Sequence, residues 1–142
     1  MYQILLPLHS YIRYIVIILL LAVIIKSFLG MSGKKPYEKI DNQLSLSLFI
    51  FTHTQLLVGL ILYLISPFVK FGAITMKDAI TRYWTVEHLV GMLIAVVLIT
   101  MARITAKKMT DHTAKHKRMF VFNSIALVII VIMILLSDRD LV

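Results

Sequence analysis

The chain lacks cysteine altogether and contains only seven acidic residues among its 142. Without cysteine there can be no disulfide bonds, no thiolate-bound metal cluster and no covalent attachment of a c-type haem. The acidic residues are outnumbered by fifteen lysines and arginines, which gives a formal net charge of +8. We expect no nucleic-acid partner for these cations, because no aromatic residues are interleaved with them.

Charge of either sign is absent from two long stretches. Leu44 to Ser66 contains none in 23 residues and Met119 to Ser137 none in 19, and about 20 apolar residues are enough for a helix to cross the hydrocarbon core of a bilayer. Two further spans, at about 5–25 and about 83–102, contain only a few polar residues. The mean hydropathy is +0.92, too apolar for a soluble domain of this size. The sequence therefore predicts an all-α, polytopic membrane protein: one up-down four-helix transmembrane bundle over residues 1–142, with the lipid bilayer as its surroundings.

The first span does not resemble a cleaved signal peptide. No basic residue precedes it, and it is longer than the apolar core of such a signal. We therefore expect it to remain in the mature protein.

The lysines and arginines indicate an orientation. Ten of them fall in or beside the segments that follow the first and third spans: Lys26, Lys34, Lys35, Lys39, Arg103, Lys107, Lys108, Lys115, Lys117 and Arg118. Five lie on or near the other side: Arg13, Lys70, Lys77, Arg82 and Arg139. Since cytoplasmic loops are enriched in these residues, both termini are predicted to lie outside.

Prolines and capping residues mark the expected helix ends. Pro67 closes the second span, and Pro7 falls where the first helical turn would begin, which suits its missing donor. Thr75 followed by Asp78 resembles a capping box. A helical segment is therefore expected to start near Met76 in the outer loop.

Four of the five histidines lie in or beside the apolar spans: His9, His53, His88 and His116. Ionisable side chains inside a membrane are rare, usually face the bundle interior and are often functional. We therefore interpret these four as candidate ligands of a cofactor held between helices. His112 falls in a polar loop.

His9 and His88 form the best-matched pair. Each lies a turn or two below the expected outer surface, on the first and third helices, which are diagonal in an up-down bundle. This arrangement suits axial ligation of one iron from two sides. Gly91 and Ala95 follow His88 on the same helix face and would admit a flat ligand, although small residues equally serve helix packing.

Arg13 is four residues after His9 and shares its helix face. It could pair with a cofactor carboxylate or with Glu87 inside the bundle, or it could extend outward to lipid head groups. The sequence leaves both interpretations open.

The inner pair, His53 and His116, is matched less well in depth. Straight helices place the two about 10 Å apart along the membrane normal. Asn123 is closer to His53 in depth, so a hydrogen bond between His53 and Asn123 is a competing prediction.

Three local strings, LHSYIR at 8–13, HTQLL at 53–57 and TVEH at 85–88, resemble those of short bacterial membrane proteins labelled cytochrome b. The arrangement also resembles the four-helix core of the transmembrane ascorbate-reducible di-haem cytochromes b. That resemblance implies haem b, one or two per chain, held by His9 with His88 and by His53 with His116. It further implies electron transfer in a bacterial inner membrane, with quinol a candidate donor and other redox proteins or membrane subunits as candidate partners.

Two other classes of function are compatible with the sequence. Glu87 beside His88 could relay a proton in a metal- or quinone-reactive subunit. Alternatively, the polar residues could only lock the helices of a cofactor-free accessory subunit of a larger membrane complex.

Overall fold

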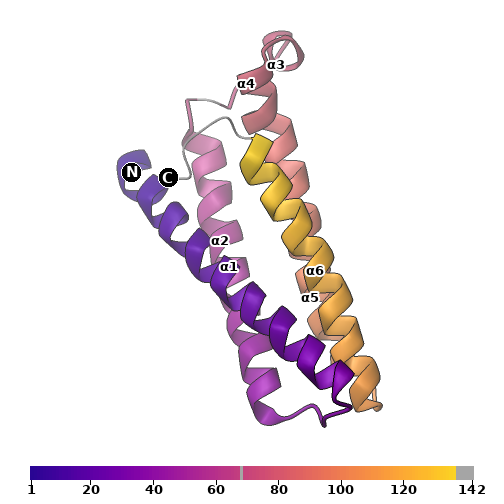
Figure 1. The fold of residues 1–142 in the computed structure, drawn as a ribbon. Coiled ribbons are helices and arrows are strands. Elements are labelled where there is room, and N and C mark those ends of the chain that lie inside the picture. The colour runs from indigo at the N-terminus through magenta and orange to yellow at the C-terminus, as the bar shows by residue number, and fades with distance from the viewer. Residues whose placement is uncertain (68, 137–142) are drawn as a thin grey trace.

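The computed structural model describes residues 1–67 and 69–136 of the chain. Its long helices are α1 (Tyr2–Ser32), α2 (Lys39–Ile65), α5 (His88–Lys107) and α6 (His112–Leu136). Two short helices, α3 (Ile74–Lys77) and α4 (Ala79–Arg82), and a π-helical turn, η1 (Tyr83–Glu87), precede α5. The segment Ala79–Lys107 is long and apolar enough to cross a membrane, as are α1, α2 and α6. The predicted all-α four-helix membrane bundle is confirmed (Figure 1).

The helices alternate in direction, and each contacts its two neighbours in the bundle. α1 packs against α2 and α6, and α5 packs against α6 and α2, so that α1 and α5 are diagonal partners, as predicted. The contact between α2 and α5 is the sparsest of the four adjacent contacts. We call the end containing Tyr2 the N-terminal end, and the end containing the α1–α2 and α5–α6 loops the basic end.

Small residues allow α5 and α6 to approach closely. Gly91, Ala95, Ala102 and Ala106 form a buried stripe on α5 at helical spacing, and Ala126 of α6 is fully buried. In lipid, such residues favour helix association because they allow close backbone contact. A Cβ on Gly91 would overlap the Met133 side chain of α6. Gly91 therefore serves helix packing in this structure.

The helices extend beyond their apolar stretches. α1 begins at Tyr2, so Pro7 lies inside the helix, and the prediction that it occupies the first turn is wrong. Backbone hydrogen bonding can continue a helix through polar residues at the membrane boundary. The length of an apolar stretch therefore underestimates the length of the helix. Arg139, counted above among the cations of the N-terminal end, lies outside the described residues.

The α2–α5 connection contains the predicted helical turn near Met76, but not its predicted cap. Asp78 caps the next helix, α4, by accepting a hydrogen bond from the Thr81 backbone N–H at 3.0 Å. Thr75 instead donates its hydroxyl to the Lys70 carbonyl. The capping-box prediction for Thr75 and Asp78 is therefore wrong, because each side chain satisfies a different backbone group.

The helix starts at the basic end are well capped. Glu38 and Asp41 form a reciprocal capping box at the start of α2, with Glu38 N–H donating to Asp41 Oδ2 at 2.8 Å. Asp111 accepts from the Ala114 N–H at 2.9 Å at the start of α6. These caps fix where both helices begin.

Candidate functional site

His9 of α1 and His88 of α5 meet across the bundle near its N-terminal end. Their ring centroids are 6.5 Å apart, with an angle of 69° between the ring planes. His9 lies seven residues after the start of α1, and His88 nine residues after the start of α4. Those offsets correspond to about 10 and about 13 Å of helix, so the pair has the matched depth expected from the sequence.

The π-helical turn determines what His88 contacts. In η1 the His88 backbone N–H bonds to the Tyr83 carbonyl, five residues earlier. This spacing places side chains five residues apart on one face, instead of the three or four of an α-helix. Tyr83 consequently lies beside His88, and Arg82 lies beside Glu87 at 2.7 Å. Such turns often occur at functional sites.

The Tyr83 hydroxyl connects His88 to α6. It donates its only proton to the Met133 carbonyl and lies 3.4 Å from His88 Nδ1. Since that proton is already used, the hydroxyl can only accept from His88, which assigns the proton of the neutral imidazole to Nδ1. His88 Nε2 then carries the free lone pair. A histidine that ligates a metal usually donates its other ring N–H in this way.

His9 is positioned by α2. A Cβ on Gly59 would lie 3.1 Å from His9 Cε1, so the absence of a side chain there gives the ring its space. Gln55, one turn earlier on α2, donates to the His9 carbonyl at 2.9 Å. Within the described part of the chain, the buried His9 Nδ1 has no hydrogen-bond partner. This orphaned nitrogen is available to a ligand.

Both imidazoles line a cavity of about 190 Å³. Its walls come mainly from α1, α2 and α5, and they are apolar for most of their area, with Leu6, Leu56 and Met92 as examples. It lies on the side of the bundle where α2 and α5 pack most sparsely. An apolar cavity with a few convergent polar groups is the usual form of a cofactor site.

Arg13 lines the same cavity, and its guanidinium lies 4.7 Å from the centre of the Tyr14 ring. Glu87 pairs with Arg82, both about one-third exposed, so it is engaged at the boundary of the bundle. A proton relay from Glu87 to His88 would first have to break this ion pair.

His53 is engaged within its own helix. Its Nδ1 lies 2.8 Å from the Phe49 carbonyl, one turn earlier on α2, and its ring packs on Phe49 with centroids 4.1 Å apart. Asn123 is fully buried and donates to the Met119 carbonyl of its own helix at 2.8 Å. Among the described contacts there is no hydrogen bond between His53 and Asn123.

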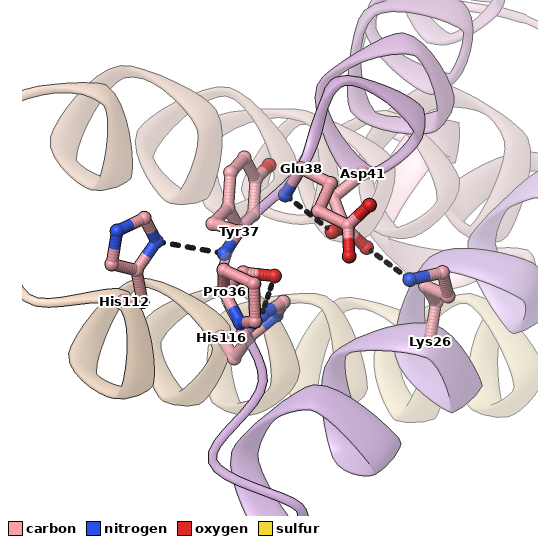
Figure 2. Close-up of polar contacts among 7 residues, drawn as sticks. All are labelled: Lys26, Pro36, Tyr37, Glu38, Asp41, His112 and His116. Atoms are coloured by element: carbon pink, nitrogen blue, oxygen red, sulfur yellow. Dashed lines mark hydrogen bonds and ion pairs between the residues drawn. The ribbon is translucent and has the colours of Figure 1, made fainter.

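His116 is enclosed at the basic end (Figure 2). It is 1% exposed, lies 5.1 Å from Tyr37 between ring centroids, and has its Nε2 3.4 Å from the Pro36 carbonyl. Pro36 precedes the first residue of α2, whereas His53 lies fourteen residues into that helix. The two histidines are therefore about 20 Å apart along the bundle, and the structure does not bring them together.

His112 is the first residue of α6 rather than part of a loop. Its Nδ1 accepts a hydrogen bond from the Tyr37 backbone N–H at 2.7 Å, which ties the α1–α2 connection to α6 (Figure 2). Across residues 1–67 and 69–136, no group of three or more histidine and acidic side chains is arranged to hold a metal ion. His9 and His88 instead lie as a pair of imidazoles on the wall of one cavity.

Three features of the site were not predicted: the Tyr83 hydroxyl beside His88, the approach of Gly59 to His9 and the bond from Gln55. Tyr83 carries no periodic signal, because its contact depends on the π-helical turn. The small residue Gly59 within the second apolar stretch was the one signal that could have been noticed.

Comparison with known proteins leaves the site to be interpreted from its own chemistry. No protein-family model matches the chain. Neither the curated proteins nor the solved structures include one that is significantly similar to it.

Proposed function

We propose that the protein is a membrane-bound b-type cytochrome that holds one haem between His9 and His88 and transfers electrons. The observation that carries this proposal is the 6.5 Å between the two ring centroids. His9 and His88 would hold the iron through their ring nitrogens, and metal–imidazole bonds of about 2.0 Å require the two rings to lie close together. The two rings are close enough that one ion could be held between them.

The hydrogen bonds of the residues at the site are also compatible with haem ligation. His88 offers Nε2 because its Nδ1–H is directed to Tyr83, and Tyr83 is itself fixed by Met133. The wall of the cavity is mostly apolar, and Arg13 supplies a cation beside His9. When bound, haem supplies one-electron chemistry, with a potential set by its axial ligands, their hydrogen bonds and burial. Two histidine ligands leave no open position, which favours electron transfer over oxygen chemistry.

His53 and His116 do not fit a shared second haem in this arrangement. They lie about 20 Å apart along the bundle, and each is engaged with a backbone carbonyl close to it. We propose one haem per chain for this reason.

The cations support the orientation, and the resemblance of the three local strings supports the bacterial inner membrane. Ten lysines and arginines gather at the basic end, and cytoplasmic loops carry such an excess. We infer that the protein is in a bacterial inner membrane with both termini outside, so that the haem is near the outer face.

A second candidate is a quinone-reactive site in the same cavity. An apolar wall together with the imidazoles and Arg13 would suit a flat, uncharged ring with carbonyl oxygens. Such a protein would be colourless when purified, whereas a bis-histidine haem gives sharp visible bands on reduction. An accessory subunit without a cofactor would show neither the bands nor a bound quinone.

The decisive experiment is a haem count per purified chain by pyridine haemochrome assay. We expect a ratio near one, lost in His9→Ala and in His88→Ala but retained in the matched control His53→Ala. Full haem with an unchanged spectrum in both His9 and His88 variants would refute the proposed ligands. A ratio near two, falling to one in His53→Ala and in His116→Ala, would instead establish the two-haem form.

A further inference from the structure

A second pocket, of about 310 Å³, lies at the basic end of the bundle. It is formed where α2 begins and α5 ends, and it is separate from the residues that line the histidine cavity. Four cations line it: Lys39, Arg103, Lys107 and Lys115. Such a concentration of positive charge favours the binding of an anion.

Arg103 is held in place by the opposite wall of the pocket. One of its terminal nitrogens donates to Ser45 Oγ at 3.1 Å and to Asn42 Oδ1 at 3.3 Å. A guanidinium has five N–H donors in a fixed fork, so the remaining donors can reach an anion. An arginine positioned in this way is well suited to bidentate recognition of phosphate.

The local acidic groups do not neutralise the pocket. Glu38 is the one carboxylate on its wall, and it is engaged in the capping box of α2. Asp41 is paired with Lys26 at 2.9 Å, outside the pocket (Figure 2). Lys115 is held over the Tyr37 ring at 5.3 Å. The pocket therefore keeps an excess of about three positive charges.

The position of the pocket favours a lipid head group over a soluble anion. The pocket lies where two apolar helices, α2 and α5, have their polar ends, and the exposed apolar side chains Leu46 of α2 and Ile104 of α5 lie within about a turn of its lining residues. Basic pockets between transmembrane helices are suited to the head groups of acidic lipids, while neighbouring apolar side chains can contact the acyl chains. A soluble anion would gain nothing from that apolar surface.

We propose that this pocket is a binding site for the phosphate-bearing head group of an anionic phospholipid. The proposal is independent of haem binding, because no residue is shared between the two sites. The lipid phosphate accepts hydrogen bonds from the Arg103 fork, and Lys107 and Lys115 contribute charge at the mouth of the pocket. A zwitterionic lipid would place its own cation among these groups and bind less well.

The test uses the full chain, purified in neutral detergent, with lipid binding measured by native mass spectrometry. Phosphatidylglycerol and phosphatidylcholine of the same acyl composition are titrated separately. The double variant Lys107→Gln/Lys115→Gln removes two pocket cations. The matched control Lys108→Gln/Lys117→Gln removes two neighbouring exposed lysines that do not line the pocket.

We expect phosphatidylglycerol to bind more tightly than phosphatidylcholine, and its binding to weaken about tenfold in the pocket variant but not in the control. Equal binding of the two lipids, or an equal loss in both double variants, would overturn the site in favour of diffuse surface charge. Inorganic phosphate is the third probe. If it displaced phosphatidylglycerol at comparable concentration, the pocket would be a site for free phosphate, and the lipid assignment would be wrong.

Discussion

Gly30 of α1 lies directly against the imidazole of His116 on α6. A Cβ atom at Gly30 would come within 2.5 Å of His116 Cε1, closer than non-bonded atoms can approach. The ring has little room to retreat, because Tyr37 packs against it and the Pro36 carbonyl lies beside its Nε2. The contact therefore sets how closely α1 and α6 approach at the basic end.

We predict that Gly30→Ala destabilises the protein by about 1–3 kcal/mol, because overpacking a closed contact forces a shift of side chain or backbone. The midpoint of thermal unfolding in detergent would measure the loss. In a His116→Ala background the added methyl group should cost much less, since the atoms it would overlap are gone. An equal cost in both backgrounds would show that the ring does not limit this contact.

Tyr83→Phe tests the hydrogen bond behind His88. Without the hydroxyl, the His88 Nδ1–H loses its acceptor, so the imidazole would be a weaker donor to the proposed haem iron, and the reduction potential of that haem should rise. Loss of such an outer partner typically weakens metal binding by about tenfold or more. Potentiometric titration and haem affinity give the two readouts. Tyr63→Phe is the matched control, because Tyr63 lines the same cavity but donates to the Thr85 carbonyl. Identical effects in both variants would show that the hydrogen bond from His88 to Tyr83 does not control the potential or the affinity.

The orientation can be tested with single cysteines, since the natural chain contains none. Ser32→Cys and Thr113→Cys lie at the basic end and should resist an impermeant thiol reagent in intact cells. Ala73→Cys, in the connection at the N-terminal end, should be labelled readily. The reverse labelling pattern would show that the protein has the opposite orientation in the membrane.

Asp78 provides a prediction for pH. The hydroxyl and then the backbone N–H of Thr81 hold the pKa of the Asp78 carboxyl below its usual value. A lowered pKa in the folded state means that this cap is fully effective above the usual aspartate pKa, about 3.9, and is lost as pH falls through the folded value. Thr81→Val should therefore raise the pKa of Asp78, whereas Thr81→Ser should leave it low, as measured by carboxyl carbon chemical shifts. A pKa unchanged in Thr81→Val would contradict the assignment.

The matched depth of His9 and His88 could be predicted from the sequence, whereas the direction of side chains around the helix axis could not. The separation of His53 from His116 along the bundle was underestimated, at about 10 Å against about 20 Å in the structure. His9 and His88 share a level because helical rise is nearly constant, so counting from the ends of the apolar stretches was sufficient. His53 and Asn123 illustrate the limit: counting put them at a similar depth, yet each side chain bonds to its own helix. The direction in which a side chain leaves its helix is decided by how the helices pack, and the depth of a residue does not predict that direction.

Local backbone geometry was the other source of difference. The contact between Tyr83 and His88 depends on a single π-helical turn, and an α-helical reading would have placed the tyrosine away from the histidine. His116 lies beside Pro36, which precedes the first residue of α2, so its separation from His53 along the bundle is about 20 Å rather than the expected distance of about 10 Å. The π-helical turn depends on the backbone hydrogen bonds of a few residues, and a hydropathy profile does not record these bonds.

If the protein binds the single haem proposed above, the wide separation of His53 from His116 limits the path that electrons can take. Because tunnelling rates fall exponentially with distance, a single haem between His9 and His88 would exchange electrons rapidly only with partners near the same membrane surface. Vectorial passage across the full thickness of the bilayer would then require a diffusing carrier or a second chain. One copy of this protein with a single haem bound would therefore exchange electrons at one face of the membrane and would not conduct them across it.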